Sequence, residues 1–355
     1  MFIRGFVISN WYINDGVAAK KLNQAQLSAR DSVLNKLSLG TYKYEKVICP
    51  VCGNTSFQTL SEKDRLGIPC RVVLCTECGL IQLNPRMTKE SYESFYNTEY
   101  RLFDSRSVGA YFDKQYQRGK SIFKDIERYS GINKYDGCYV VEIGCGAGGI
   151  LKYFKNKGCT IKGYDYGTEY LNYGRVQHGL DLECGGIELH DHSLKADIII
   201  YSHTFEHLLE PNRDLSKSHD ILNENGLIFI HVPSYKKVLK GFYDADLLRC
   251  FQIAHTYYFS MRTLCNLVEN NGFELMIGTE DVRCIFRKSD KRNNSYDSDY
   301  ADAMRCIRIS EVLRLIYRIL PIYHIAWYAK KALIRAIELV GIKEHIREFA
   351  YKMRK

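Results

Sequence analysis

The stretch VVEIGCGAGG, residues 140–149, places a cluster of glycines directly after a short apolar run. Gly144, Gly146 and Gly149 match the G-x-G-x-x-G spacing of a dinucleotide-binding turn. Gly144, Gly146 and Gly148 equally match G-x-G-x-G, a spacing that implies a different cofactor from a dinucleotide. Glycines at a strand end let the backbone approach a nucleotide and aim the next helix N-terminus at it. The stretch therefore predicts a nucleotide-type cofactor at the carboxyl end of a buried strand.

Short β-rich runs alternate with helical patterns on both sides of this turn, between residues 138 and 286. The runs are CYVVEI, CTIKGYD, ADIIIYS, GLIFIHV, FELMIG and VRCIF. Such alternation is typical of an α/β protein with a parallel sheet. Ligands in open sheets of this kind bind beyond the carboxyl ends of the strands.

Two acidic residues bear on the identity of the cofactor. A dinucleotide fold usually carries an apolar residue shortly before its first glycine, where this chain has Glu142. Asp165 in KGYDYG ends the second run and suits a ribose diol in either cofactor class. Glu142 therefore argues against a nicotinamide or flavin cofactor, whereas Asp165 does not discriminate between the classes.

The motifs VVEIGCGAGG, GYDYG, ADIIIYSHTFEHLLEP and LNENGLIFIHVPS, in this order, resemble those of class I S-adenosylmethionine-dependent methyltransferases. The resemblance covers about residues 135–286 and implies a Rossmann-like seven-stranded sheet with S-adenosylmethionine as cofactor. It assigns the methionine moiety to the glycine turn, the ribose to Asp165, and the adenine to Tyr166 and residues 186–188. The implied cofactor-binding residues are Glu142, Gly144, Cys145, Gly146, Gly148, Asp165, Tyr166 and Ser202.

The loop SHTFEHL follows the third predicted strand, where the reacting centre is expected. We assign His203 as the general base for methyl transfer, His255 in IAHTYYFS as the second candidate, and His207 as a pocket residue. A histidine with an ordinary pKa is largely neutral at pH 7 and can accept a proton. The loop also spells H-x-x-E-H, so a metallohydrolase and a metal-assisted methyl transfer stay open. Tyr100 and Arg101 are candidates for closing over the cofactor or the acceptor.

The sequence contains two knuckles, CPVCG at residues 49–53 and CTECG at residues 75–79, with 22 residues between Cys52 and Cys75. Each offers two thiolates, and four sulfurs complete a tetrahedral Zn²⁺ site. The predicted metal ligands are Cys49, Cys52, Cys75 and Cys78. A four-cysteine site leaves no open coordination position, so this zinc is expected to be structural.

The flanks, KDRLGIPCRVVLCTECGLIQLNPRMTKESYESFYNTEYRLF and LLRCFQIAHTYYFSMRTLCNLVENNGFE, resemble bacterial methyltransferases with an N-terminal zinc ribbon. Because that group is associated with sugar-nucleotide and polysaccharide biosynthesis, the resemblance implies a sugar or glycan-precursor substrate, methylated on oxygen or carbon. One alternative is an RNA methyltransferase that uses the ribbon to grip RNA, although nucleic acid is not the expected partner. A second alternative is a nonenzymatic zinc-ribbon adaptor.

The net charge of +9 is concentrated in residues 301–355, which hold 12 Lys and Arg against 5 Asp and Glu. This tail reads as basic amphipathic helices, with Ile309, Val312, Leu313, Ile316 and Leu320 on one apolar face and Arg314 away from it. A second helix is predicted at about residues 323–340. The tail suits packing on the protein, a homo-oligomer contact or a peripheral contact with anionic lipid.

Thirteen cysteines, an odd number without an export signal, indicate a reducing compartment. The expected location is cytoplasmic, with the inner face of the membrane kept open. The expected domains are a helical arm (1–45), the zinc ribbon (46–86), a helical connector (87–134), the methyltransferase domain (135–289), a linker (290–300) and the helical tail (301–355). Residues 16–38 of the arm are expected to form one helix.

Overall fold

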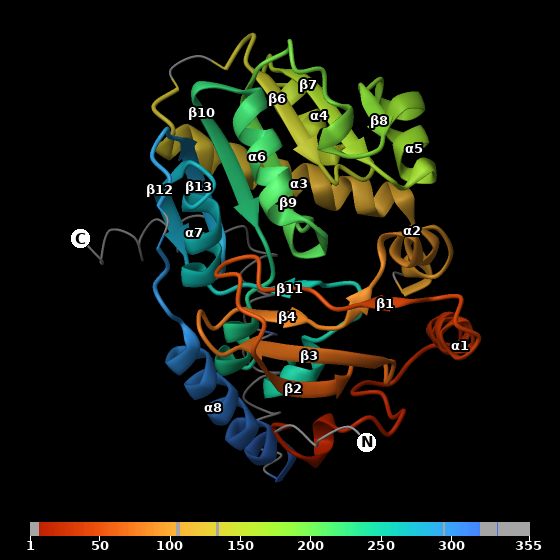
Figure 1. Cartoon of the computed structure of the whole chain (residues 1–355). Helices are drawn as coiled ribbons and strands as arrows, with labels where there is room; N and C mark the ends of the chain where they lie inside the picture. Colours follow the sequence, from red (N-terminus) through yellow and green to blue (C-terminus); the bar gives the residue numbers. More distant parts are fainter. Residues whose placement is uncertain (1–6, 104–106, 133–134, 294, 320–331, 333–355) are drawn as a thin grey trace.

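The computed structural model describes residues 7–103, 107–132, 135–293, 295–319 and 332. Its two main sheets lie one above the other in Figure 1, and the long last helix runs beside the lower one. The upper sheet is the α/β domain predicted from the glycine turn. The lower sheet belongs to the segment that holds the two cysteine knuckles, which we call the cysteine unit (residues 46–86).

The upper sheet has seven strands in the order β12-β13-β10-β9-β6-β7-β8. The five strands from β8 to β10 run parallel, whereas β13 is antiparallel to both of its neighbours. The sheet is therefore mixed rather than purely parallel. All six predicted runs are strands, and β8 was missed because it has three residues. The bounds are β6 Tyr139–Ile143, β7 Thr160–Asp165, β8 Leu182–Cys184, β9 Ala196–Ser202, β10 Leu222–His231, β12 Phe273–Thr279 and β13 Arg283–Lys288.

Helices cover both faces of this sheet, so its central strands are apolar on both sides. In β9, Ile198 and Ile200 pack with α3, α4 and α5, while Ile199 and Tyr201 pack with α6 and α7. The helix bounds are α3 Val108–Tyr129, α4 Gly149–Lys155, α5 Thr168–His178, α6 Pro211–Ile221 and α7 Met261–Glu269. The two apolar layers fix the strands, and the loops at their carboxyl ends hold the polar residues.

The lower sheet has four strands in the order β11-β4-β3-β2. Strand β11 belongs to the chain after β10, and Tyr257 and Tyr258 pair with Gln82 and Ile81 of β4. The cysteine unit therefore does not form its sheet alone. The bounds are β2 Phe57–Lys63, β3 Pro69–Cys75, β4 Ile81–Leu83 and β11 Tyr257–Tyr258, with a separate pair β1 Tyr44–Glu45 and β5 Arg86–Met87.

The N-terminal arm carries η1 (Asn10–Tyr12) and α1 (Gln24–Ser38). The predicted helix starts eight residues too early, because Asn23 caps the true start in a reciprocal pair of hydrogen bonds with Gln26. The connector forms α2 (Lys89–Thr98) and η2 (Tyr100–Phe103) before α3. The remaining short turns are η3 Ile187–Leu189, η4 Phe205–His207, η5 Tyr235–Lys240, η6 Phe242–Ala245 and η7 Leu247–Arg249.

The predicted linker packs along the cysteine unit. The backbone N–H of Asp299 donates to the carbonyl of Cys78 at 3.0 Å, and the Ser298 hydroxyl donates to the carbonyl of Glu77. A side chain at Gly79 would meet the backbone of Tyr300 at 2.4 Å. The segment therefore holds α8 (Tyr300–Ile319) against the cysteine unit, and we call residues 290–300 the strap.

Helix α8 buries a different face from the one predicted. Ile309 and Val312 are 43% and 57% exposed, whereas Arg314 is 5% exposed. Arg314 forms an ion pair with Glu311 and its guanidinium lies 5.5 Å from the Trp11 ring. This partner comes from the far end of the sequence, so helical periodicity alone could not reveal it. The predicted second helix lies almost entirely outside the described residues.

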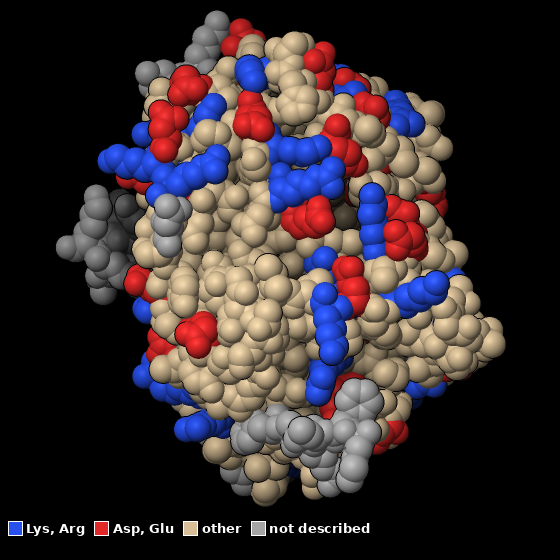
Figure 2. All heavy atoms as spheres, in the orientation of Figure 1, with Lys and Arg blue, Asp and Glu red and all other residues tan. Residues whose placement is uncertain are grey.

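Basic and acidic side chains are interspersed over the face of the molecule shown in Figure 2. Within the described residues, no helix combines the length and apolar character needed to cross a bilayer.

Candidate active site

The glycine turn follows β6 as predicted, and its backbone needs glycine. Gly144, Gly146 and Gly148 have φ angles of 72°, 54° and 78°, a region that other residues rarely adopt. Gly148 is the N-cap of α4. The turn is fastened to β7, because the N–H groups of Gly144 and Cys145 both donate to the carbonyl of Tyr164. The chain thus passes tightly between the strand and the helix, as nucleotide binding requires.

Helix α3 clamps this turn through Gln115, which the sequence analysis missed. Its side-chain amide donates to the carbonyl of Cys145 at 2.8 Å, and its amide oxygen accepts from the N–H of Gly149 at 3.3 Å. Gln115 is 3% exposed. A side chain at Gly149 would meet the carbonyl of Phe112 at 2.3 Å, so the helix lies directly on the turn. The shape of the turn therefore depends on a helix outside the motif.

Asp165 lies at the end of β7, next to the turn. Its two oxygens accept from the N–H groups of Gly146 at 2.9 Å and Gly167 at 2.7 Å. Arg101 of η2 places a guanidinium nitrogen 3.5 Å from the same carboxylate and stacks 4.1 Å from the Tyr170 ring. The structure thus brings the predicted closing residue Arg101 to the predicted ribose residue. Asp165 remains 13% exposed, which leaves its carboxylate within reach of a ligand.

Glu142 tests whether this site fits a cationic cofactor. The side chain is fully buried, and neither carboxylate oxygen has a hydrogen-bond partner. Burial raises the pKa of Glu142 well above its ordinary value, while the charge of Arg118 acts in the opposite direction. A buried carboxyl without a partner is costly. An amino group from a ligand would satisfy it, and S-adenosylmethionine carries one in its methionine moiety.

The other predicted cofactor residues lie around the same strand ends. Tyr166 is 52% exposed, and its hydroxyl donates to Glu188 at 3.1 Å. The N–H of Gly186 donates to the same oxygen at 3.0 Å, so Tyr166 and residues 186–188 form one wall. Ser202 ends β9, and its buried hydroxyl has no hydrogen-bond partner. This wall is the expected adenine side, and Ser202 lies toward the reacting side.

A cavity of about 460 Å³ is lined in part by Arg101, which contacts Asp165. It is lined by Asp64 and Arg65 of the cysteine unit, by Arg101 of η2, by α3, and by the loops after β9 and β10. Four of its lining side chains are cationic, namely Arg65, Arg101, Lys114 and Arg118. Glu206 contributes less negative charge to this cavity near pH 7, because burial raises its pKa to about 8. The cavity therefore favours an anionic ligand.

All three predicted catalytic histidines line this cavity. They surround Glu206, whose Oε1 lies 3.8 Å from Nδ1 of His203, 3.9 Å from Nε2 of His207 and 4.0 Å from Nε2 of His255. These side chains form one edge of the cavity, which we call the rim. His255 reaches the rim because the hydroxyl of Thr256, the next residue, contacts the carbonyls of Glu206 and Leu208. The prediction that His255 folds over the same rim as the loop after β9 is therefore confirmed.

The three imidazoles are held neutral. Burial lowers the pKa of His203 to about 2, that of His207 to about 4, and that of His255 well below its ordinary value. The charge of Arg118 also lowers the pKa of His203. His203 is the most accessible, with 33% of its side chain exposed against 15% for His207 and 10% for His255. A proton acceptor at this rim is thus available, although each imidazole is a weak base.

The four knuckle cysteines come together, and three of them are buried in an apolar cluster that includes residues of α7. The Sγ atoms of Cys49 and Cys78 are 3.4 Å apart, those of Cys52 and Cys75 are 3.5 Å apart, and all four lie within 4.8 Å of one another. A tetrahedral zinc with 2.3 Å bonds needs sulfurs roughly 3.8 Å apart. The donor set and its spacing fit a zinc ion. None of the four residues lines the cavity.

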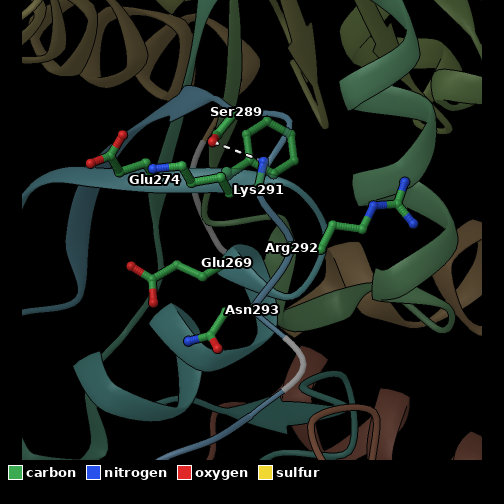
Figure 3. Close-up of a pocket in the computed structure, with 7 residues that line it drawn as sticks. Glu269, Glu274, Ser289, Lys291, Arg292 and Asn293 are labelled. Carbon is green, nitrogen blue, oxygen red and sulfur yellow. Dashed lines mark hydrogen bonds between the residues drawn. The ribbon is translucent and has the colours of Figure 1, made fainter.

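A second hollow of about 380 Å³ lies at the other end of the sheet (Figure 3). Its lining side chains come from the end of α7, the start of β12 and the first residues of the strap. The Lys291 N–H donates to the Ser289 hydroxyl inside it. This hollow is at the amino end of β12, opposite the strand ends that bind ligands in open sheets. It contains no histidine or cysteine, so we place no chemistry there.

Residues 112–276 match the family model of a methyltransferase domain, which includes the glycine turn, Asp165 and all three histidines. The chain carries a methyltransferase domain over these residues. This enzyme class uses S-adenosylmethionine, and the seven-stranded sheet has the architecture that the motif resemblance implies. The protein is therefore an enzyme, and a nonenzymatic adaptor is not favoured.

Solved structures of methyltransferases share part of the fold. One from Methanosarcina mazei is 14% identical and covers 46% of this chain and 96% of its own, with a TM-score of 0.37. One from Mesorhizobium loti is 13% identical and covers 44% and 94%, also with a TM-score of 0.37. An amino pentose methyltransferase from Micromonospora echinaspora is 16% identical and covers 36% and 52%, with a TM-score of 0.26. No curated protein matches the chain.

Sequence analysis missed several residues of this methyltransferase site. Gln115 and Arg118 are one turn apart on α3, and Tyr111 and Lys114 lie on the same side. Polar residues at helical spacing just ahead of the glycine turn were the available signal. Arg65 gave no local signal, because only the docking of the cysteine unit brings it to the cavity. Glu206 was noted within the H-x-x-E-H spelling, but its central position among the histidines was not foreseen.

Proposed function

We propose that this methyltransferase transfers the methyl group of S-adenosylmethionine to a sugar hydroxyl or sugar carbon of a nucleotide-sugar or polysaccharide precursor. The observation that carries the proposal is the cavity itself. It brings three neutral histidines together with four cationic side chains, one of which, Arg101, contacts the predicted ribose residue Asp165. A sugar carrying a phosphate or diphosphate suits this combination, since its anionic part can face the cations while a hydroxyl faces the histidines.

In this proposal the cofactor binds along the carboxyl ends of β6 and β7. Asp165 accepts from the ribose hydroxyls, Glu142 faces the amino group, and the wall at Tyr166 contacts the adenine. The bound cofactor supplies an electrophilic methyl group on a sulfonium sulfur. The rest of the site then has to align the acceptor and exclude water. Alignment can account for roughly 7–11 kcal/mol of rate enhancement in favourable cases.

His203 is the proposed proton acceptor. It follows the last residue of β9 and is the most exposed of the three imidazoles. For a hydroxyl acceptor, the imidazole takes the O–H proton as the oxygen attacks the methyl carbon. For a carbon acceptor, it takes a proton beside a sugar ketone. General bases of this kind typically contribute about 10²- to 10⁴-fold in rate. His207 and His255 are the remaining candidates for this role.

The cysteine unit is proposed to be a zinc ribbon whose metal has a structural role. Its four cysteines have the spacing of a closed tetrahedral site. Its hairpin between β2 and β3 carries Asp64, which accepts from the backbone N–H groups of Leu66, Ile68 and Ile253. The bond from Ile253 fastens the ribbon to the loop that also carries His255. The ribbon thus supplies one wall of the acceptor cavity, including Arg65.

The test is methyl transfer from isotopically labelled S-adenosylmethionine to a panel of nucleotide-activated sugars, the matching free sugars and RNA. We expect label in an activated sugar, weaker or no labelling of the free sugar, and one S-adenosylhomocysteine per methyl transferred. Mass spectrometry and NMR of the product then separate an O-methyl from a C-methyl group. Label found only in RNA would contradict the sugar proposal and favour the RNA alternative.

A further inference from the structure

The acidic and histidine side chains at the rim form a compact set of ligand atoms. Glu206, His207 and His255 each offer one ligand atom, and these atoms lie within 4.8 Å of one another. Nε2 of His207 and Nε2 of His255 are 3.9 Å and 4.0 Å from Oε1 of Glu206. Two histidines and one carboxylate, with room for further ligands, are a common binding set for divalent transition metals.

Glu206 provides the second, independent observation. Its side chain is 2% exposed, and neither carboxylate oxygen has a hydrogen-bond partner. A buried carboxyl in this state lacks the partner that such groups normally have. Nitrogen atoms of three histidines lie 3.8–4.0 Å from Oε1 of Glu206. These separations are too long for hydrogen bonds and suit groups that face a shared ion.

His207 has the tautomer that a metal ligand needs. Its Nδ1 lies 2.8 Å from the carbonyl of Ala254, which can only accept, so Nδ1 carries the proton. The lone pair is then on Nε2, the atom that faces Glu206. Metal-binding histidines typically donate their other ring N–H to a backbone carbonyl in this way. The Tyr96 hydroxyl contacts the same carbonyl and the same ring nitrogen, so the ring orientation is fixed.

We propose that Glu206, His207 and His255 bind a divalent metal ion that holds the acceptor by two adjacent oxygen atoms, such as a vicinal diol of the sugar. All three residues line the cavity, so an ion that they held would be accessible to a ligand in the cavity. The cysteine site has no such opening. Arg118 lines the same cavity, and its charge and that of a bound divalent ion would both attract an anionic oxygen, which a phosphorylated sugar supplies.

This inference rests on the proposed function and adds a role for the ion. A metal lowers the pKa of a hydroxyl that it coordinates, so even a weak base can accept the proton. In the step, His203 takes the proton of the coordinated hydroxyl and the oxygen forms a bond to the methyl carbon. The carbon–sulfur bond breaks, and its electron pair stays on the sulfur of S-adenosylhomocysteine. His207 and His255 then act as ligands rather than as bases.

The test uses the full chain with its cysteine site loaded with zinc. Mn²⁺ alone is titrated by calorimetry and by electron paramagnetic resonance, without cofactor or acceptor. We expect about one further ion per chain, with nitrogen coupling from imidazole. Glu206→Gln keeps the size of the side chain and should weaken Mn²⁺ binding by at least about 10- to 100-fold. The matched control is Glu210→Gln, which changes a 60%-exposed carboxylate in the same loop.

His255→Gln is the second variant and should weaken Mn²⁺ binding in the same way. Binding of S-adenosylmethionine, measured in parallel, should stay within about twofold in both variants. Wild-type protein that binds cofactor and methylates an acceptor but takes up no Mn²⁺ would overturn the metal inference and leave the proposed function standing. Equal Mn²⁺ affinity in wild type and Glu206→Gln would also overturn it. Loss of cofactor binding in the wild type would instead contradict the proposed function.

Discussion

The molecule contains two clusters of ligand-type side chains, and their surroundings differ. The sulfur atoms of Cys49, Cys52, Cys75 and Cys78 lie together, and none of these residues lines the cavity. His203, Glu206, His207 and His255 lie at the cavity wall, with one face toward a ligand. A closed set of thiolates can hold a fold together, whereas an open set of imidazoles and a carboxylate can contact a substrate. Access to the cavity, rather than the number of ligand atoms, therefore distinguishes the cluster with a structural role from the cluster that can contact a substrate.

The largest expected effect is at the closed cluster. Cys49→Ser should lose the zinc and destabilise the chain by at least about 4 kcal/mol, because a structural zinc supplies roughly 10–16 kcal/mol of folding free energy in small zinc domains. Metal analysis and thermal unfolding provide the measurement. Cys184→Ser is the control, since Cys184 is exposed and outside the cluster. A metal-free Cys49→Ser protein with wild-type stability would contradict the scaffold role.

The open cluster should respond in turnover and not in folding. His203→Asn should lower turnover by about 10²- to 10⁴-fold while cofactor affinity stays within about twofold. Asparagine is chosen because His203 has a φ of 58°, which asparagine tolerates well. Steady-state kinetics and cofactor calorimetry separate the two readouts, with the exposed His192→Asn as control. Unchanged turnover would remove His203 from the role of base.

The proposed ribose-binding residue, Asp165, can be tested separately from the histidines. Asp165→Ala should weaken S-adenosylmethionine binding by about 100-fold, since hydrogen bonds to a charged group contribute roughly 1.5–3 kcal/mol each. Asp181→Ala is the matched control, because Asp181 is a 65%-exposed carboxylate one strand away. If both variants bound the cofactor as well as wild type does, Asp165 would not be the ribose residue.

The smallest expected effect is at Asp64, which joins the cysteine unit to the loop that carries His255. Burial raises the pKa of Asp64 to about 6 from an ordinary value of 3.8, so the folded protein holds this proton more tightly than the unfolded chain. The stabilising contribution is complete below about pH 4 and is lost as the pH rises through about 6. The free energy of unfolding should therefore fall by about 1–3 kcal/mol over this range.

Asp64→Asn provides the comparison for this pH dependence. The amide does not titrate, so the variant should lack this part of the slope between pH 4 and pH 6. Denaturant unfolding at several pH values measures both proteins. Parallel stability curves for wild type and variant would show that Asp64 does not titrate in this range.

The sequence predicted the parts of the fold and the site that depend on local pattern. The glycine turn, Asp165 and the histidines after β9 were placed correctly because each follows a strand whose apolar run is plain. The pairing of β11 with β4 could not be predicted, since it joins segments about 175 residues apart. The same long-range docking brings Arg65 to the cavity. Sequence periodicity also misplaced the buried face of α8, because the environment of Arg314 includes Trp11.

The central claim is that the strand ends around Glu142 and Asp165 bind S-adenosylmethionine. Its most direct test is calorimetric titration of the zinc-loaded protein with S-adenosylmethionine, and separately with NADH. The account predicts saturable binding of about one S-adenosylmethionine per chain and none of the nicotinamide cofactor. No heat of binding with S-adenosylmethionine, or tighter binding of NADH, would contradict it.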